Sequence, residues 1–175
     1  MPSYFFDSSA IVKRYHREPG TSWVKALSEP RTHPPIYIAQ LAEVEVVAAL
    51  CRVGRHEGLH PSFVDTMQNT FERHLALSDP NRALLVYVLV AISPTVLSLA
   101  SSLCARYWEM QPYPLRSLDA IQLACAIAAA KGLGDELIFV TADARLGTIA
   151  PNDCSIGELP GYQSALSTTV VRSTN

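Results

Sequence analysis

Two carboxylates follow predicted strands along the chain. Asp7 comes directly after the aromatic run Tyr4-Phe5-Phe6, and Asp143 comes two residues after Leu137-Ile138-Phe139-Val140-Thr141. Runs of aromatic and β-branched residues of this length are typical of buried strands. Each acid has an ordinary explanation, because Asp is a preferred N-cap and a helical pattern follows both positions. The alternative is a metal ligand, and neither position alone decides between the two.

A third carboxylate, Asp119, lies near the start of a predicted helix. Residues 118–130 contain no other charged side chain and are apolar on almost every face, which predicts a largely buried helix. A carboxylate there needs compensation, either from the helix dipole or from a bound cation. The helix predicted over 40–53 offers two more acids, Glu43 and Glu45, and periodicity does not choose between them. A solvated surface or an ion pair would explain either one.

Several carboxylates that converge on one point repel one another, which raises their pKa values. A divalent cation removes that penalty. Oxygen ligands without Cys or His suit Mg²⁺ or Mn²⁺. These ions commonly act on phosphates, by stabilising the attacking and leaving oxygens and by making bound water more acidic. The acids therefore predict a metal site for phosphate chemistry, provided that the fold brings them together.

Strands alternate with helices, which predicts an α/β fold with a parallel sheet and helices on both faces. The predicted strands cover 3–7, 36–39, 84–92 and 137–141, with a weaker fifth over 155–159; the predicted helices cover 9–15, 22–27, 40–53, 62–77, 95–108 and 117–131, with a short one after Asp143. In such sheets the ligand site lies at the carboxyl ends of the strands, near a reversal of strand order. Asp7 and Asp143 both follow strands and therefore belong at that edge.

Composition narrows the class of protein. A chain of 175 residues with 49% hydrophobic and 17% charged residues predicts one globular domain. The net charge of -2 and the lack of a basic run do not announce a nucleic-acid binder by charge alone. Four scattered cysteines without a CxxC pair favour a reducing compartment. No signal peptide or membrane span is expected, so the predicted location is cytoplasmic, without a membrane partner.

Four segments of the chain resemble those of PIN-domain ribonucleases. They are Asp7-Ser8-Ser9-Ala10-Ile11-Val12-Lys13, the spacing Leu41-x-x-x-Glu45-Val46-x-x-Ala49-Leu50-x-Arg52, Leu115-Arg116-Ser117-Leu118-Asp119-Ala120-Ile121-Gln122-Leu123-Ala124, and Phe139-Val140-Thr141-Ala142-Asp143-Ala144-Arg145-Leu146. Their order and spacing agree over about residues 1–149, and the third and fourth are the most specific. Within the family, the best match is to VapC-type toxins of toxin–antitoxin pairs.

The resemblance implies a PIN-like three-layer sandwich, with a central parallel sheet of four to five strands, over residues 1–160. A poorly ordered tail over 161–175 is expected after it. The chain departs from VapC-type sequences at Pro151-Asn152-Asp153-Cys154, which shortens the helix after the fourth acid and leaves the last strand without a clear signal. The implied activity is that of a Mg²⁺- or Mn²⁺-dependent endoribonuclease, in which metal-bound water attacks a phosphodiester in line.

Residue roles follow from the same resemblance. Asp7 and Asp119 would be the main metal ligands, and Glu45 and Asp143 would complete the acidic pocket directly or through water. Glu45 is chosen over the fallback Glu43 because Leu41 and Arg52 flank it as in the family. Thr141 would orient water or the metal's surroundings. Ser8 would support the site, although a turn or cap role suits it equally.

The resemblance also implies partners: an RNA substrate, a cognate antitoxin and a second copy of the chain in a homodimer. The segments 22–27 and 40–53 carry apolar residues on more than one face, which fits an interface or simple burial in the core. Basic residues near the acids in sequence could grip RNA or be ordinary surface charge; they are Lys13, Arg14, Arg52, Arg116 and Arg145.

Two rival interpretations remain. His56-Glu57-Gly58-Leu59-His60 matches the zinc-protease pattern HExxH, but that motif needs both histidines on one intact helical face. Gly54, Gly58 and Pro61 instead predict a loop that ends the helix. The second rival is a PIN-fold scaffold or RNA-binding protein without catalytic activity. The presence of all four acids argues against it, because decayed sites usually lose some of theirs.

Overall fold

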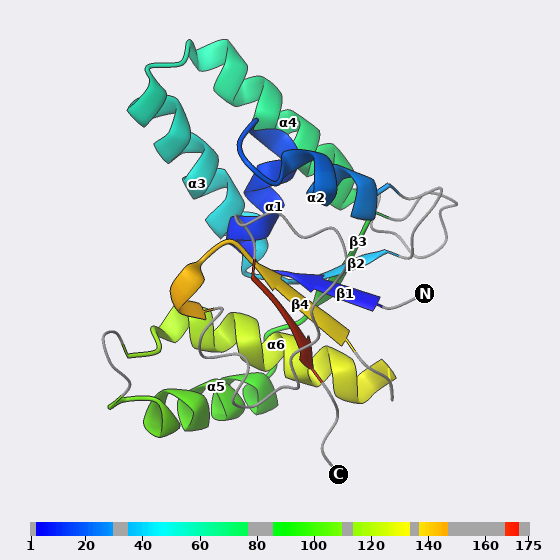
Figure 1. Cartoon of the computed structure of the whole chain (residues 1–175), viewed down its shortest axis with the longest axis vertical. Coiled ribbons are helices and arrows are strands. Elements are labelled where there is room, and N and C mark those ends of the chain that lie inside the picture. Colours follow the sequence, from blue (N-terminus) through cyan, green and yellow to red (C-terminus); the bar gives the residue numbers. More distant parts are fainter. Residues whose placement is uncertain are drawn as a thin grey trace.

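The computed structural model describes residues 3–29, 35–76, 86–109, 114–133, 137–146 and the strand 167–171. Five strands form one sheet in the order β3-β2-β1-β4-β5, as Figure 1 shows. They are β1 (Ser3–Phe6), β2 (Ile36–Ala39), β3 (Tyr87–Val90), β4 (Leu137–Thr141) and β5 (Ser167–Val171). The first four strands are parallel to their neighbours, and β5 is antiparallel to β4. The predicted α/β class with a parallel sheet is confirmed.

Helices cover both faces of the sheet (Figure 1). One layer holds α1 (Ser8–Tyr15), α2 (Thr21–Leu27), α3 (Ala42–Glu57) and α4 (Pro61–Ala76); the other holds α5 (Pro94–Arg106) and α6 (Ser117–Leu133). Within the described part of the chain, no helix combines the length and the apolar character needed to cross a bilayer.

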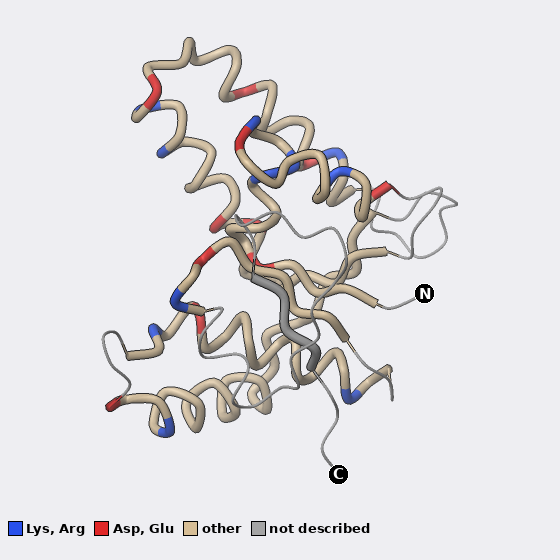
Figure 2. Tube along the Cα trace, in the orientation of Figure 1, with Lys and Arg blue, Asp and Glu red and all other residues tan. Residues whose placement is uncertain are grey.

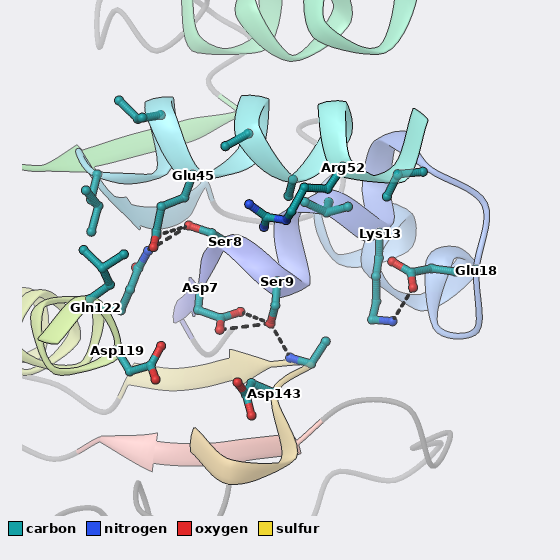
Figure 3. A pocket seen from close by; sticks show the side chains of 18 residues that line it. Asp7, Ser8, Ser9, Lys13, Glu18, Glu45, Arg52, Asp119, Gln122 and Asp143 are labelled. Atoms are coloured by element: carbon teal, nitrogen blue, oxygen red, sulfur yellow. Dashed lines mark hydrogen bonds and ion pairs between the residues drawn. The ribbon is translucent and has the colours of Figure 1, made fainter. Parts of the chain in front are cut away.

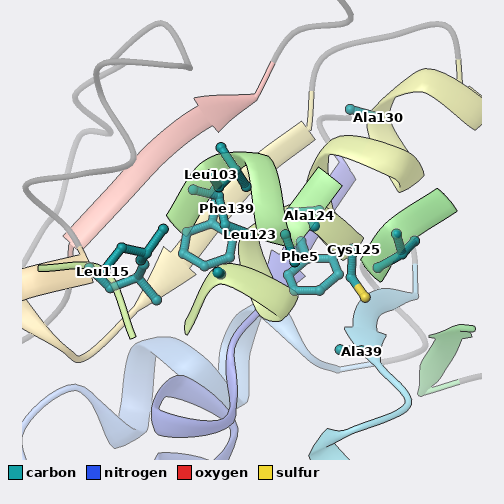
Figure 4. Close-up of a cluster of buried hydrophobic side chains, with 14 of the residues drawn as sticks. Phe5, Ala39, Leu103, Leu115, Leu123, Ala124, Cys125, Ala130 and Phe139 are labelled. Atoms are coloured by element: carbon teal, nitrogen blue, oxygen red, sulfur yellow. The ribbon is translucent and has the colours of Figure 1, made fainter. Parts of the chain in front are cut away.

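Alternation along the strands explains why there are two layers. Successive strand residues point to opposite faces, so Tyr4 and Phe6 join the core under α1 to α4, whereas Phe5 joins the core under α5 and α6. Phe5 stacks on Phe139 of β4 with ring centroids 5.7 Å apart (Figure 4). Apolar residues on both faces are what a parallel sheet between two helical layers requires.

The helix α6 is buried as its sequence predicts. Leu123, Ala124 and Cys125 are fully buried, and Figure 4 shows them beside Phe5 and Phe139. An all-apolar helix packs between the sheet and α5 because each of its faces has apolar surface to remove from water. This packing fixes the first turn of α6, and with it Asp119, near the carboxyl ends of the strands.

The prediction that Gly54 helps to end the third helix is wrong. The helix α3 continues through Gly54 to Glu57, and Gly58, with a φ of 62°, forms its C-cap. A Cβ atom at position 54 would lie 2.4 Å from Cγ2 of Val64 on α4. Gly54 therefore allows α3 and α4 to approach closely.

A fifth strand lies near the chain end, within the segment 161–175. Residues 167–171 form β5, which pairs with the whole of β4 from Leu137↔Val171 to Thr141↔Ser167. Pairing there satisfies the backbone groups of β4 that would otherwise form a sheet edge. The strand expected over 155–159, the domain boundary expected near 160 and Cys154 lie outside the described residues.

Candidate active site

A pocket of about 770 Å³ opens where the order of strands reverses. The strand β1 lies between β2 and β4, so the chain has built the sheet first to one side of β1 and then to the other. The pocket lies at the carboxyl ends of these strands and brings together the four acids predicted from sequence, Asp7, Glu45, Asp119 and Asp143 (Figure 3). Figure 2 shows acidic positions gathered in the same region.

Asp7 is the most firmly held of the four acids. Its side chain is buried and accepts hydrogen bonds from the Thr141 hydroxyl at 2.7 Å, the Ser9 hydroxyl at 2.7 Å and the Ala10 backbone N–H at 2.9 Å. The bond from Ala10 makes Asp7 the N-cap of α1. The two explanations offered by the sequence, a helix cap and a site carboxylate, therefore describe the same side chain.

Burial has a cost for the charged form of Asp7. It raises the pKa of the carboxyl from 3.8 to about 6, although the hydrogen bonds from Thr141, Ala10 and Ser9 lower it; the nearby charge of Asp119 raises it slightly further. An anion in this position is stabilised by a cation placed beside it.

Asp119 shares the electrostatic field of the other acids. It lies half-buried in the first turn of α6. Burial raises the pKa of its carboxyl, and so do the charges of Asp143 and Glu45, while Arg145 and Arg116 lower it. The neighbouring carboxylates thus disfavour the charged form of Asp119, in opposition to the two arginines.

Asp143 is paired within its own turn. Arg145 donates to it from Nη2 at 2.6 Å, from Nε at 3.1 Å and from the backbone N–H at 2.8 Å. These bonds outweigh burial and lower the pKa of the Asp143 carboxyl. The backbone bond is the capping interaction predicted from sequence, and the side chain still lines the pocket.

Glu45, and not Glu43, reaches the pocket. Glu43 is exposed on α3 and does not line the pocket, whereas Oε2 of Glu45 accepts hydrogen bonds from the Ser8 hydroxyl at 2.6 Å and from Nε2 of Gln122 at 2.6 Å. Nε2 of Gln122 also donates to Ser8 at 2.8 Å. This orientation of the amide places its donor against the carboxylate, which is the arrangement that the hydrogen-bond network requires. Ser8 supports Glu45 and is not a cap.

Two further residues of the site carry no role in the sequence-based prediction. The Ser9 hydroxyl donates to Asp7 and accepts from the Ala142 backbone N–H at 2.8 Å, which links β4 to α1. Gln122 is 3% exposed and donates a hydrogen bond from Nε2 to Glu45. Its signal in the sequence is that it is the one other polar side chain of the apolar segment 118–130, one turn after Asp119.

The PIN domain family model matches residues 4–152, a span that contains all four pocket acids. The chain belongs to the PIN-domain family. PIN domains are generally nucleases, so membership supports nuclease activity in a general sense. No curated protein matches the chain.

The residues of this PIN domain fit a hydrated divalent cation better than a fully enclosed one. In the described ranges no three or more Asp, Glu, His or Cys side chains converge closely enough to hold a metal by themselves. Mg²⁺ commonly keeps several waters and takes only one or two carboxylates from the protein. Asp7 and Asp119 could supply that number. Oε1 of Gln122, which is buried and has no hydrogen-bond partner among the described residues, can accept a hydrogen bond from water.

The HExxH pattern of this PIN domain does not form a zinc site. His56 lies in the last turn of α3, and His60 lies beyond the C-cap Gly58, so one helical face does not carry both. Nδ1 of His60 pairs with the Ser62 hydroxyl at 2.8 Å. The zinc interpretation fails because Gly58 ends the helix between the two histidines.

Proposed function

We propose that this PIN domain is a Mg²⁺- or Mn²⁺-dependent endoribonuclease that cleaves RNA phosphodiester bonds. The observation that supports the proposal most is the condition of Asp7. Its carboxylate is buried, oriented by three donors and raised in pKa, and it lies in one pocket with three more acids. Such an arrangement destabilises the metal-free protein, and a bound cation would offset that cost.

Each residue of the pocket has a role in this proposal. Asp7 and Asp119 would hold the cation, which when bound acidifies water and stabilises the charge on the transferring phosphoryl group. Ser9 and Thr141 orient Asp7 and prevent its rotation. Glu45, held by Ser8 and Gln122, would orient the attacking water and accept its proton.

The direct test is cleavage of RNA oligonucleotides by the purified protein with Mg²⁺, with Mn²⁺ and with EDTA. We expect cleavage with either ion, none with EDTA and none by Asp119→Asn. Asp65→Asn is the matched control, because Asp65 is an exposed acid on α4 outside the pocket, and it should cleave as wild type does. Cleavage in EDTA would contradict metal dependence. No cleavage of any RNA by wild type, with no bound metal, would favour the catalytically inactive PIN scaffold.

We further propose that the protein is the toxin of a toxin–antitoxin pair, as a cytoplasmic homodimer. The support is the likeness of its four acidic segments to VapC-type toxins. Expression of wild type should arrest growth, expression of Asp119→Asn should not, and a small protein encoded beside it should restore growth when co-expressed. Light scattering of the purified protein tests the dimer. Normal growth in the presence of demonstrable ribonuclease activity would reject the toxin role alone.

A further inference from the structure

The pocket extends well beyond the four acids, along the inner face of α3. Glu45, Ala48, Ala49 and Arg52 line it in turn. Their spacing of three, four and seven residues places them on one face of the helix. Because the two alanines are small, the floor between Glu45 and Arg52 is open enough for a chain-like ligand to lie along it.

Only two cations, Lys13 and Arg52, are among the described residues that line the pocket. Lys13 is already occupied: its side chain is 7% exposed, and its ammonium pairs with Glu18 at 3.2 Å and donates to the Pro19 carbonyl at 3.1 Å. Arg52 is exposed and has no hydrogen bond or ion pair with any described residue. It is therefore the uncompensated cation of the pocket in the part of the chain that the structure describes.

The position of Arg52 relative to the acids is set by the helix. Seven residues separate it from Glu45, which is about 10 Å along the axis. Side chains of an α-helix lean toward its N-terminus, so the guanidinium reaches back toward Glu45. In Figure 3 it points in the direction of Ser8, which donates to Glu45. The cation thus lines the same pocket as the acids but is outside their hydrogen-bond network.

We propose that Arg52 binds a phosphate group of the RNA strand next to the bond that is cleaved. This inference rests on the proposed ribonuclease function and names the feature of the substrate that the site recognises. RNA must approach a pocket lined by five carboxylates, Asp7, Glu18, Glu45, Asp119 and Asp143. A cation at the acids offsets their charge for the scissile phosphate only, so the neighbouring phosphate needs a second positive partner.

The chemistry of Arg52 suits that role. A guanidinium presents a planar fork of N–H donors that binds phosphate oxygens in a bidentate manner. Contacts to phosphate do not read base identity. Arg52 therefore positions the strand along α3 and contributes to affinity for any RNA sequence, whereas the pocket acids act on the bond itself.

The test compares Arg52→Gln with Arg55→Gln. Arg55 is the matched control, because it is an exposed arginine three residues further along α3 that does not line the pocket. RNA binding is measured by fluorescence anisotropy in the Asp119→Asn background, so that cleavage does not interfere. We expect Arg52→Gln to weaken binding about tenfold. For Arg52→Gln, the slope of log binding constant against log salt concentration should be shallower than for the unsubstituted arginine by about 0.7, the value for one phosphate contact to a single strand. Arg55→Gln should change binding less than twofold.

A second measurement locates the contact. Each oligonucleotide carries one neutral methylphosphonate linkage, which is moved one position at a time away from the cleaved bond. Cleavage kinetics are measured with wild type, Arg52→Gln and Arg55→Gln, all with Asp119 intact. The linkage next to the cleaved bond should raise KM for wild type and Arg55→Gln but should have no further effect on Arg52→Gln. Equal responses of all three proteins at every linkage would overturn the inference, and so would equal binding by the two arginine variants. If RNA binding depends on Arg52 but wild type cleaves no RNA, the contact stands and the ribonuclease function fails.

Discussion

At Asp7, burial and hydrogen bonding act on the carboxyl pKa in opposite directions, and burial prevails. The pKa of about 6 means that the folded protein favours the protonated form more than the unfolded chain does. The contribution of Asp7 to stability is therefore complete below its ordinary pKa of 3.8 and is lost as the pH rises through about 6. The corresponding difference is about 3 kcal/mol.

We expect the metal-free wild-type protein to lose stability relative to Asp7→Asn between pH 3.8 and about 6, because only wild type acquires the buried charge. Urea unfolding in EDTA at several pH values measures this. Added Mg²⁺ should narrow the difference, since it binds the charged form. Parallel pH curves for the two proteins would show that the pKa of Asp7 is not raised, and unfolding of Asp7→Asn would show that its role is structural.

Gln122 provides a second residue-scale prediction. Gln122→Leu removes one of the two donors that hold Glu45, while its Oε1 has no described partner to lose. We expect kcat to fall about 10- to 100-fold, as is common when a supporting hydrogen bond of a metal site is removed. KM should change little, because the contact proposed to bind the RNA strand is made by Arg52 and not by Gln122.

The control for Gln122→Leu is Gln68→Leu on α4, where the amide donates to Sγ of Cys51 away from the pocket. Both variants should unfold at similar urea concentrations. An equal loss of activity in the two would indicate a general effect on the fold and would reject the positioning role of Gln122.

Sequence reasoning located all four pocket acids and two of their supports, Ser8 and Thr141, but it missed Gln122 and Ser9. Asp7 and Asp143 were identifiable because a carboxylate after a buried strand is a specific local pattern. Gln122 and Ser9 were not, because their partners, Glu45 and the Ala142 N–H, are distant in sequence and their contacts arise only when the sheet assembles. Hydrogen bonds between segments far apart in the chain have no local signature.

At the scale of elements, the contact between α3 and α4 depends on the absence of a side chain at position 54. Gly54→Ala places a Cβ 2.4 Å from the Val64 side chain, and the β-branched valine has few alternative rotamers. We expect a loss of about 1 to 3 kcal/mol in the free energy of unfolding from this overpacking, reduced in part by the better helix propensity of Ala.

Gly132→Ala in α6 is the matched control, because nothing lies within 4 Å of the added Cβ. It should stabilise the protein by up to about 1 kcal/mol through helix propensity alone. Urea unfolding of both variants gives the comparison. If both substitutions stabilise the protein, then α3 and α4 are not in tight contact at Gly54.

The same glycine explains where sequence reasoning about elements failed. A glycine followed four residues later by another glycine favours a helix end, and the two have opposite roles here. Gly58 ends α3 through its positive φ, whereas Gly54 serves close packing inside the helix. Only the position of Val64 on the facing helix distinguishes them, and the order of residues along α3 does not contain it.

At the scale of the whole molecule, β5 protects the sheet. A chain that lacks residues 167–175 would leave β4 as an exposed edge with unpaired backbone groups. We expect this truncated protein to be less stable and to self-associate, as measured by urea unfolding and light scattering. Thr169→Pro, which removes one backbone donor opposite Phe139, should have the same effect in milder form. A truncated chain as stable and as dispersed as the full chain would contradict the role of β5.

The parallel pairing of the central strands followed from the alternation of strands and helices, but β5 did not. Its residues carry a modest strand preference, and their pairing partner lies about thirty positions earlier in the chain. Whether such a segment joins the sheet depends on the free edge of β4, which is a property of the assembled molecule.

The hydrogen bonds among Ser8, Glu45 and Gln122 join helices that belong to opposite layers of the sandwich. Ser8 and Glu45 come from α1 and α3 on one face of the sheet, and Gln122 comes from α6 on the other. They therefore connect the two helical layers across the end of the sheet. If Gln122→Leu removes this connection, the two layers should move more freely relative to each other. Amide hydrogen exchange in the first turn of α6 should then be faster than in wild type, without loss of the global fold. The width of the pocket between α3 and α6 then depends on the stiffness that these three hydrogen bonds give to the connection.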